Sequence, residues 1–212
     1  MKKRVLLVGA TGTIGTAVAA LLSPSHDVVR IARRDAEMEM DALSAESIRA
    51  MYQSAGPFDA MVSTMGSAVP GPLTQLSPQD FADSFLRKVL AQINLVLLGL
   101  PHIAAGGSFA LSSGILSTMP QPGFTAISMA NAAIDGFCRG AACELPAGVR
   151  INCVRPVFVR ESFPEGSVAD FGGLPVQTAA ETAAAYKAAV EGDFTGRDLD
   201  PRDLESAGRF SG

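Results

Sequence analysis

The chain of 212 residues lacks tryptophan and has few tyrosines, histidines and cysteines: two, two and three. The cysteines, Cys138, Cys143 and Cys153, are odd in number and do not have the spacing of metal ligands. We therefore predict neither a disulfide framework nor a metal site. Reduced cysteines of this kind are typical of a cytoplasmic protein, which is where we expect this one.

Long apolar runs and an excess of basic residues are absent as well. No stretch approaches the roughly 20 apolar residues that a membrane span needs. The run VLLV near the N-terminus is too short for the hydrophobic region of a signal peptide. Lys and Arg number 17 against 21 Asp and Glu, which gives a formal net charge of −4. We expect neither a membrane nor a nucleic acid as a partner, because a nucleic-acid binder usually carries a basic surface.

The sequence is rich in apolar residues, and strand-like segments alternate with helix-like segments along it. Hydrophobic residues make up 48% of the chain and the mean hydropathy is +0.26, which suits a sheet buried on both faces. Short apolar runs typical of strands alternate with segments whose apolar residues recur at helical spacing. Strands are expected at 4–10, 26–34, 37–42, 58–66, 106–114, 148–156 and 195–201, and helices at 13–23, 44–55, 77–100, 123–146 and 176–192.

This alternation predicts an α/β fold, namely a single-domain, doubly wound parallel sheet of the Rossmann type with helices on both faces. A chain of 212 residues is long enough for one substantial core and short enough to be one unit. We therefore predict a single domain over 1–212. Its polar, glycine-rich end, 201–212, is expected to be either a flexible tail or a strap across an interface.

A glycine-rich turn, VGATGTIG, lies directly between the first predicted strand and the first predicted helix. Its GxxGxxG pattern permits a tight turn, lets the backbone approach a pyrophosphate, and ends at a helix N-terminus whose amides bind phosphate oxygens. In this context we favour dinucleotide binding over an ordinary glycine turn. The expected contact residues are Gly9, Thr11, Gly12, Thr13, Ile14 and Gly15.

The end of the second predicted strand indicates which dinucleotide is bound. NAD-binding folds have an acid there for the ribose 2′-hydroxyl, whereas NADP binders need positive charge for the 2′-phosphate. Arg33 and Arg34 stand in that place, and arginine holds phosphate through two hydrogen bonds. We predict NADP as the cofactor. The alternatives are a solvated arginine pair, or NAD held with the help of Asp35, which follows closely.

Together these motifs resemble the short-chain dehydrogenase/reductase family over nearly the whole chain. Asp41 in MDALS resembles the aspartate that contacts the adenine amino group, and Gly66 in STMG is the glycine kept from the family's NNAG. The stretch ALSSG is similar to the strand end that carries the catalytic serine, so Ser112 or Ser113 matches it. RINCVRPVFVRES resembles the family's RVNxVxPGxVxT, with Pro156 retained.

The main departure from the family is the loss of its catalytic pair. Aligning NAAIDGF with the continuation of the family's YxxxK motif puts Ile127 at the tyrosine and Asn131 at the lysine. No tyrosine lies between Tyr52 and Tyr186, so the usual general acid is missing. The asparagine of the family's fourth helix aligns with Lys88, which is either a replacement acid or a solvated helix lysine.

The resemblance implies an NADP(H)-dependent oxidoreductase that acts on a small carbonyl/alcohol pair through a degenerate active site. Positioned proton transfer contributes roughly 10²–10⁴-fold to a rate, so losing it predicts a slow or differently equipped enzyme. Ser112 or Ser113 would orient the substrate, Asn131 would hold the ribose, and Lys88 would assist. The alternative is a non-catalytic NADP(H)-binding sensor or scaffold. The resemblance also implies a homodimer or homotetramer built on the two helices expected at 77–100 and 123–146.

Overall fold

The structure, a computed structural model, describes residues 2–163 and 175–206. Its centre is a parallel sheet of seven strands in the order β3-β2-β1-β4-β5-β6-β9. The strands are β1 (Arg4–Val8), β2 (Asp27–Ala32), β3 (Met38–Glu39), β4 (Phe58–Ser63), β5 (Ile103–Ser112), β6 (Arg150–Val154) and β9 (Asp198–Leu199). The order reverses between β1 and β4, so the predicted doubly wound α/β fold is confirmed.

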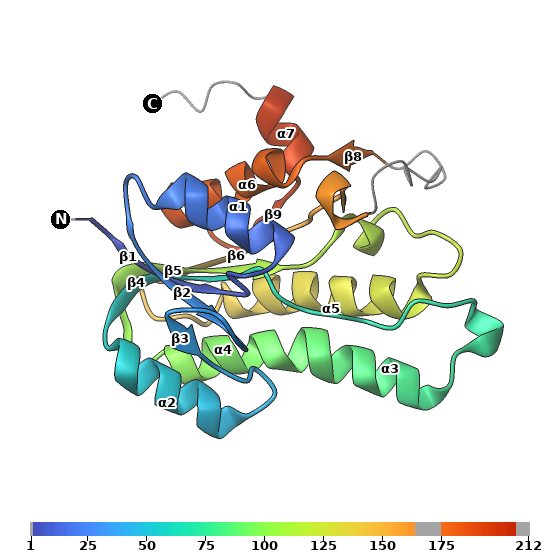
Figure 1. The fold of residues 1–212 in the computed structure, drawn as a ribbon, viewed down its shortest axis with the longest axis horizontal. Helices are drawn as coiled ribbons and strands as arrows, with labels where there is room; N and C mark the ends of the chain where they lie inside the picture. Colours follow the sequence, from blue (N-terminus) through green and yellow to red (C-terminus); the bar gives the residue numbers. More distant parts are fainter. Residues whose placement is uncertain (1, 164–174, 207–212) are drawn as a thin grey trace.

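Helices cover both faces of the sheet (Figure 1). One layer holds α1 (Thr13–Leu22), α6 (Ala179–Glu191) and α7 (Pro201–Ser206), and the other holds α2 (Ala45–Ala55), α3 (Pro78–Ser84), α4 (Ala91–Gly99) and α5 (Thr125–Ala141). A small second sheet pairs β7 (Phe158–Val159) with β8 (Val176–Gln177). In the described part of the chain, no helix combines the length and the apolar character needed to cross a bilayer.

The helix expected over 77–100 contains a feature that periodicity does not reveal. It starts as predicted, because Ser77 caps it in a reciprocal pair with Asp80 and Pro78 occupies its first turn. Between α3 and α4 it then widens into a π-helical turn, Phe85–Leu90. Single π turns inside α-helices are frequent at functional sites, and this one carries Lys88.

Other boundaries differ modestly from the sequence prediction. The helix expected over 123–146 ends at Ala141, several residues before Pro146. The last strand is confined to Asp198–Leu199. The segment expected to be a flexible tail or strap begins with α7, where Pro201 takes the first helical position and Asp200 bonds to Arg202 just inside the helix. Residues 207–212 lie outside the described residues.

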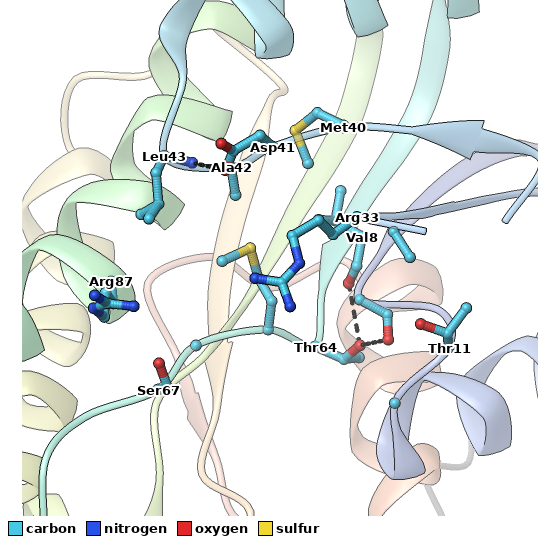
Figure 2. Close-up of a pocket in the computed structure, with 15 residues that line it drawn as sticks. Val8, Thr11, Arg33, Met40, Asp41, Ala42, Leu43, Thr64, Ser67 and Arg87 are labelled. Carbon is cyan, nitrogen blue, oxygen red and sulfur yellow. Dashed lines mark hydrogen bonds between the residues drawn. The ribbon is translucent and has the colours of Figure 1, made fainter. Parts of the chain in front are cut away.

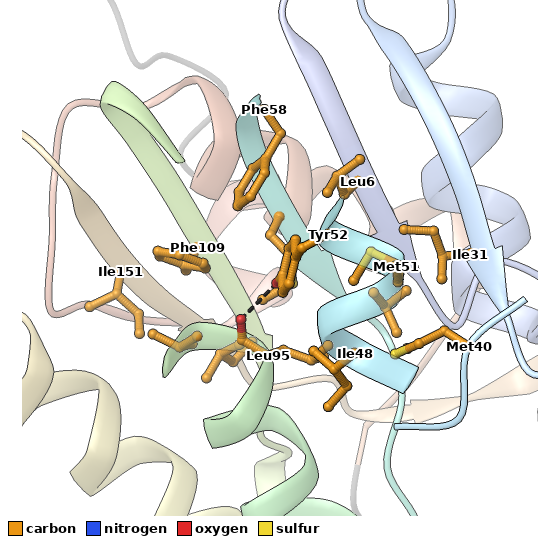
Figure 3. Packing of buried hydrophobic residues seen from close by; sticks show 14 of the residues in the cluster. Leu6, Ile31, Met40, Ile48, Met51, Tyr52, Phe58, Leu95, Phe109 and Ile151 are labelled. Atoms are coloured by element: carbon orange, nitrogen blue, oxygen red, sulfur yellow. Dashed lines mark hydrogen bonds between the residues drawn. The ribbon is translucent and has the colours of Figure 1, made fainter. Parts of the chain in front are cut away.

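The continuous apolar strands are explained by a core on each face of the sheet. Along β1, Leu6 faces the core under α2, α4 and α5, whereas its neighbour Leu7 faces the core under α1 and α6. Figure 3 shows the first of these cores, where Tyr52 donates a hydrogen bond from its hydroxyl to the Leu95 carbonyl oxygen at 2.6 Å. The parallel strands end together at one edge of the sheet, and in folds of this kind ligands bind beyond these carboxyl ends.

Candidate functional site

A cavity of about 380 Å³ lies over the carboxyl ends of β1, β2 and β4. Figure 2 shows it between the turn after β1, the end of β2 and the helix that carries Arg87. We call it the arginine end of the cleft, because Arg33 and Arg87 both line it. The predicted cofactor residues that line it are Gly9, Thr11, Gly12, Arg33, Asp41 and Gly66.

The glycine turn is shaped by close backbone contacts. Gly9 has a φ of +84°, and a Cβ atom there would lie 2.9 Å from Thr64 Oγ1. A Cβ on Gly15 would lie 2.1 Å from the Gly9 carbonyl oxygen, so helix α1 packs directly against the turn. Gly12, the N-cap of α1, has no side chain to cap the helix. The first amides of α1 are therefore available to an anion.

The two predicted arginines differ in position. Both are exposed and follow the end of β2, but only Arg33 lines the cavity. Asp41 stands on the rim, where its carboxylate accepts the Leu43 N–H at 3.0 Å. Arg87 was missed by sequence reasoning, since nothing in a regular helical pattern separates it from other exposed helix arginines.

Two further cavities continue the cleft beyond Gly66 and Ser67. One, of about 520 Å³, shares these two residues with the arginine end. The other, of about 160 Å³, shares Lys88 with the larger one. We call these two together the lysine end. The predicted residues that line it are Ile14, Gly66, Lys88, Ser113, Asn131 and Pro156, while Thr13 is exposed at the start of α1 and lines none of these cavities.

The structure separates the two candidate serines. Ser112, the last residue of β5, points to the face covered by α6, where its hydroxyl donates to the Ser63 carbonyl oxygen at 2.7 Å and contacts the Tyr186 hydroxyl at 2.5 Å. It does not line the cleft, which corrects the prediction that left Ser112 as an alternative to Ser113. Ser113 does line the lysine end. The reason is the two-residue alternation of a strand, which puts neighbours on opposite faces.

The Ser113 hydroxyl is already engaged in the protein. It donates to the Asn131 carbonyl oxygen at 2.9 Å and so ties the end of β5 to α5. The Ser113 carbonyl oxygen in turn accepts a hydrogen bond from Lys88 Nζ at 3.0 Å. Ser113 therefore links Lys88 to Asn131 on α5.

Lys88 brings an ammonium group into the cleft from the π-helical turn. Burial lowers its pKa from 10.5 to about 8, against the opposing effect of the negative charge on Asp135. The turn is fixed by Gln92, whose side-chain amide donates to the carbonyl oxygens of Lys88 and Ser112 and accepts the Ser112 N–H. Gln92 is fully buried. It was not recognised in the sequence because no local pattern pairs a helix glutamine with a distant strand.

Asn131 offers an unpaired acceptor inside the cleft. The residue is 2% exposed, and within the described residues its Oδ1 has no hydrogen-bond partner. A Cβ added to Gly114 would lie 2.6 Å from Asn131 Nδ2, so the amide is packed closely against that turn. A buried acceptor without a partner is costly unless a ligand supplies the donor.

No tyrosine reaches the cleft. Ile127, aligned with the family's tyrosine, lines the lysine end and packs with the buried residues Ile115, Leu116 and Val157. The two tyrosines of the chain are both fully buried in the cores, Tyr52 on α2 and Tyr186 on α6. Ile127 therefore contributes an apolar side chain to the cavity that Lys88 also lines.

Three side chains of ligand type converge behind the lysine end: Asp135, Cys153 and Asp198. The Arg155 guanidinium lies among them and bonds to Asp135 at 2.9 Å and to Asp198 at 2.6 Å. Burial raises the pKa of the Asp135 carboxyl, but the hydrogen bonds and positive charge of Arg155 outweigh this effect, so the pKa lies below its ordinary value and the group stays ionised. Arginine thus supplies the positive charge that a metal would otherwise bring.

Comparison with known proteins places the chain in a family. A family model described as enoyl-(acyl carrier protein) reductase matches residues 19–191. The uncharacterized oxidoreductase MT0954 of Mycobacterium tuberculosis is 28% identical, over 93% of this chain and 90% of its own. The crystal structure of the protein lin1944 from Listeria innocua is 38% identical with a TM-score of 0.88, covering 93% of this chain and 98% of that one.

A small-chain dehydrogenase solved in complex with NADPH has the same fold, with a TM-score of 0.81 and 24% identity over 94% of this chain and 96% of its own. Because the family model covers most of the chain, the chain belongs to the short-chain dehydrogenase/reductase family. These are oxidoreductases that bind a nicotinamide cofactor and act on small molecules.

Proposed function

We propose that the protein is an NADP(H)-dependent oxidoreductase that interconverts a small carbonyl compound and its alcohol. The observation that carries this proposal is one cleft with two chemically distinct ends, joined through Gly66 and Ser67. The arginine end contains guanidinium groups suited to a phosphate, and the lysine end contains an ammonium group whose pKa is lowered to about 8. Such a separation suits a long dinucleotide whose reacting ring lies far from its phosphate groups.

Residues along the cleft fit the parts of this cofactor in order. Arg33 would bind the 2′-phosphate. The turn at Gly12 and the uncapped N-terminus of α1 would bind the pyrophosphate. The unpaired Oδ1 of Asn131 would accept a hydrogen bond from a ribose hydroxyl. When bound, the nicotinamide supplies or accepts a hydride.

In this proposal, Lys88 is the general acid and base. Its ammonium group donates a proton to the substrate oxygen during reduction, and its amine accepts one during oxidation, because a pKa of about 8 lets both forms exist near neutral pH. Ser113 positions this group through its carbonyl oxygen. Ile127 cannot exchange a proton, and it contributes an apolar wall that limits hydration around the reacting atoms.

A second candidate function is a non-catalytic NADP(H)-binding sensor or scaffold. The observation that favours it is Ile127 in the place of the family's tyrosine, which removes the usual acid while leaving the arginine end intact. The loop expected to select a substrate spans 157–175, and its residues 164–174 lie outside the described residues. An experiment is therefore needed to distinguish the enzyme from the sensor.

The test is a fluorescence titration of the purified protein with NADPH and, in parallel, NADH, followed by a screen of small aldehydes and ketones for NADPH oxidation. We expect NADPH to bind more tightly than NADH and at least one carbonyl compound to be reduced. NADPH binding without turnover of any compound would favour the sensor. Binding of neither dinucleotide would overturn both functions.

A further inference from the structure

The arginine end of the cleft contains a second guanidinium that the family motifs do not account for. Arg33 reaches the cavity from the end of β2, and Arg87 reaches it from the π-helical turn, far away in the sequence. Figure 2 shows Arg87 projecting from a helix on the side of the cavity opposite the strand that carries Arg33. Two arginines from separate layers of the fold therefore face one cavity.

The charges of this cavity are not balanced by the protein. Among the residues that the structure describes, neither Arg33 nor Arg87 takes part in an ion pair or side-chain hydrogen bond, whereas Arg139 and Arg155 each bond to carboxylates. In the described part of the chain, Asp41 is the one acid that lines the cavity, and its carboxylate accepts the Leu43 N–H. Two positive charges thus face one negative charge, which favours a ligand with more than one negative charge.

We propose that Arg87 acts with Arg33 to bind the phosphate monoester on the adenosine ribose of the dinucleotide, and that Arg87 thereby determines the preference for NADP(H) over NAD(H). This inference rests on the proposed function. A phosphate monoester near neutral pH carries up to two negative charges and three acceptor oxygens. One planar guanidinium satisfies two of these oxygens, which leaves acceptors for a second arginine.

The π-helical turn explains how Arg87 comes to face this cavity. Arg87 lines the arginine end while the next residue, Lys88, lines the lysine end. The turn is held at the end of β5 by the buried Gln92, which bonds to Ser112 and to the Lys88 carbonyl oxygen. Arg87 therefore projects from an anchored backbone, although its own side chain is exposed.

The experiment compares Arg87→Met and Arg87→Lys with the wild-type protein. Arg49→Met is the matched control, because Arg49 is an exposed helix arginine on α2 that does not line the cleft, so it removes the same charge elsewhere. Affinities are measured for NADPH and NADH, and for three fragments: adenosine 2′,5′-bisphosphate, adenosine 3′,5′-bisphosphate and 5′-AMP. The fragments distinguish a 2′-phosphate from the 3′-phosphate of another nucleotide. Thermal unfolding verifies that each variant is folded.

We expect Arg87→Met to weaken NADPH and 2′,5′-bisphosphate binding about tenfold or more while leaving NADH and 5′-AMP unchanged, because a hydrogen bond to a charged group is lost. Arg87→Lys should restore part of the affinity, and Arg49→Met should change neither ligand. If the wild type prefers NADPH and Arg87→Met keeps the same ratio of NADPH to NADH affinity, the role of Arg87 is overturned. Tighter binding of the 3′,5′-bisphosphate than of the 2′,5′-bisphosphate would also overturn it. Failure of the wild type to bind either dinucleotide would instead overturn the proposed function.

Discussion

Lys88 shows how a single side chain alters the proton chemistry available to the cleft. An exposed lysine has a pKa near 10.4 and holds its proton too firmly to exchange it readily at neutral pH. Burial in the lysine end lowers the pKa of Lys88 to about 8, although the nearby charge of Asp135 acts in the opposite direction. The group is held by the Ser113 carbonyl oxygen, and Lys88 lines one cavity together with Asn131 and another together with the apolar Ile127.

The first prediction at the residue scale concerns pH. Reduction needs the ammonium form of Lys88, so its rate should be highest below pH 8 and fall as the pH rises through the pKa. Oxidation of the alcohol needs the amine, so its rate should rise over the same range. Lys88→Met should lower both rates about 100-fold or more and remove this pH dependence.

Initial rates in both directions between pH 6 and 10 test this, with Lys3→Met as the control, since Lys3 is exposed and directly precedes β1. A Lys88→Met variant that keeps the wild-type transition near pH 8 would assign the titration to another group. In that case Lys88 would be no more than a positioning residue.

At the scale of elements, the π-helical turn and the end of β5 form one unit. Gln92 makes three hydrogen bonds that join them, one to the Lys88 carbonyl oxygen and two to the backbone of Ser112. These bonds are buried, so no water replaces them readily when the amide is removed. The unit sets the position of Arg87 and Lys88 and thus connects both ends of the cleft to the sheet.

We predict that Gln92→Leu lowers the free energy of unfolding by about 2 kcal/mol or more, because the buried N–H and carbonyl of Ser112 lose their partners while the volume hardly changes. Urea unfolding followed by circular dichroism measures this. Gln53→Leu is the control, since Gln53 is exposed on α2 and has no such bonds. Equal unfolding midpoints and slopes for Gln92→Leu and the wild type would show that these bonds add nothing to stability.

At the scale of the whole molecule, α4 and α5 leave an apolar surface uncovered. Leu97 on α4 is 55% exposed. It borders a groove of about 390 Å³ between the two helices, together with Leu100, Phe137 and Leu145. An exposed leucine beside an apolar groove of this kind is typical of an interface between subunits. We propose that a second copy of the chain covers this surface in a homodimer or homotetramer, as the family resemblance implies.

The corresponding prediction is that Leu97→Glu weakens this assembly, because a carboxylate would be buried in an apolar interface without a partner. Light scattering coupled to size-exclusion chromatography should show a dimer or tetramer for the wild type and a smaller species for the variant. Leu73→Glu provides the control, because Leu73 is 61% exposed but lies outside both helices. A monomeric wild type, or a Leu97→Glu variant of unchanged mass, would contradict the prediction.

Local sequence patterns predicted the fold, and several of the residues that they indicated line the cleft. The glycine turn, Arg33 and the strand end that carries Ser113 are short-range features, because a strand, a turn and a helix start place their residues relative to one another within a few positions. The same patterns did not separate Ser112 from Ser113, since a one-residue change in a strand reverses the face. They also did not reveal the π-helical turn. Gln92, which contacts this turn, bonds to the backbone of Ser112, and a local pattern does not show a contact so distant in the sequence.

The sequence by itself determined the alternation of strands and helices, the glycine turn after the first strand, and the absence of a tyrosine from α5. These follow from the order of residues along the chain, and tertiary contacts do not alter them. Only the tertiary structure decided that Arg87 shares a cavity with Arg33, that Lys88 meets Ser113, and that the Asn131 acceptor is buried without a partner. These pairs come from different elements, and the packing of helices on the sheet sets the distances between them.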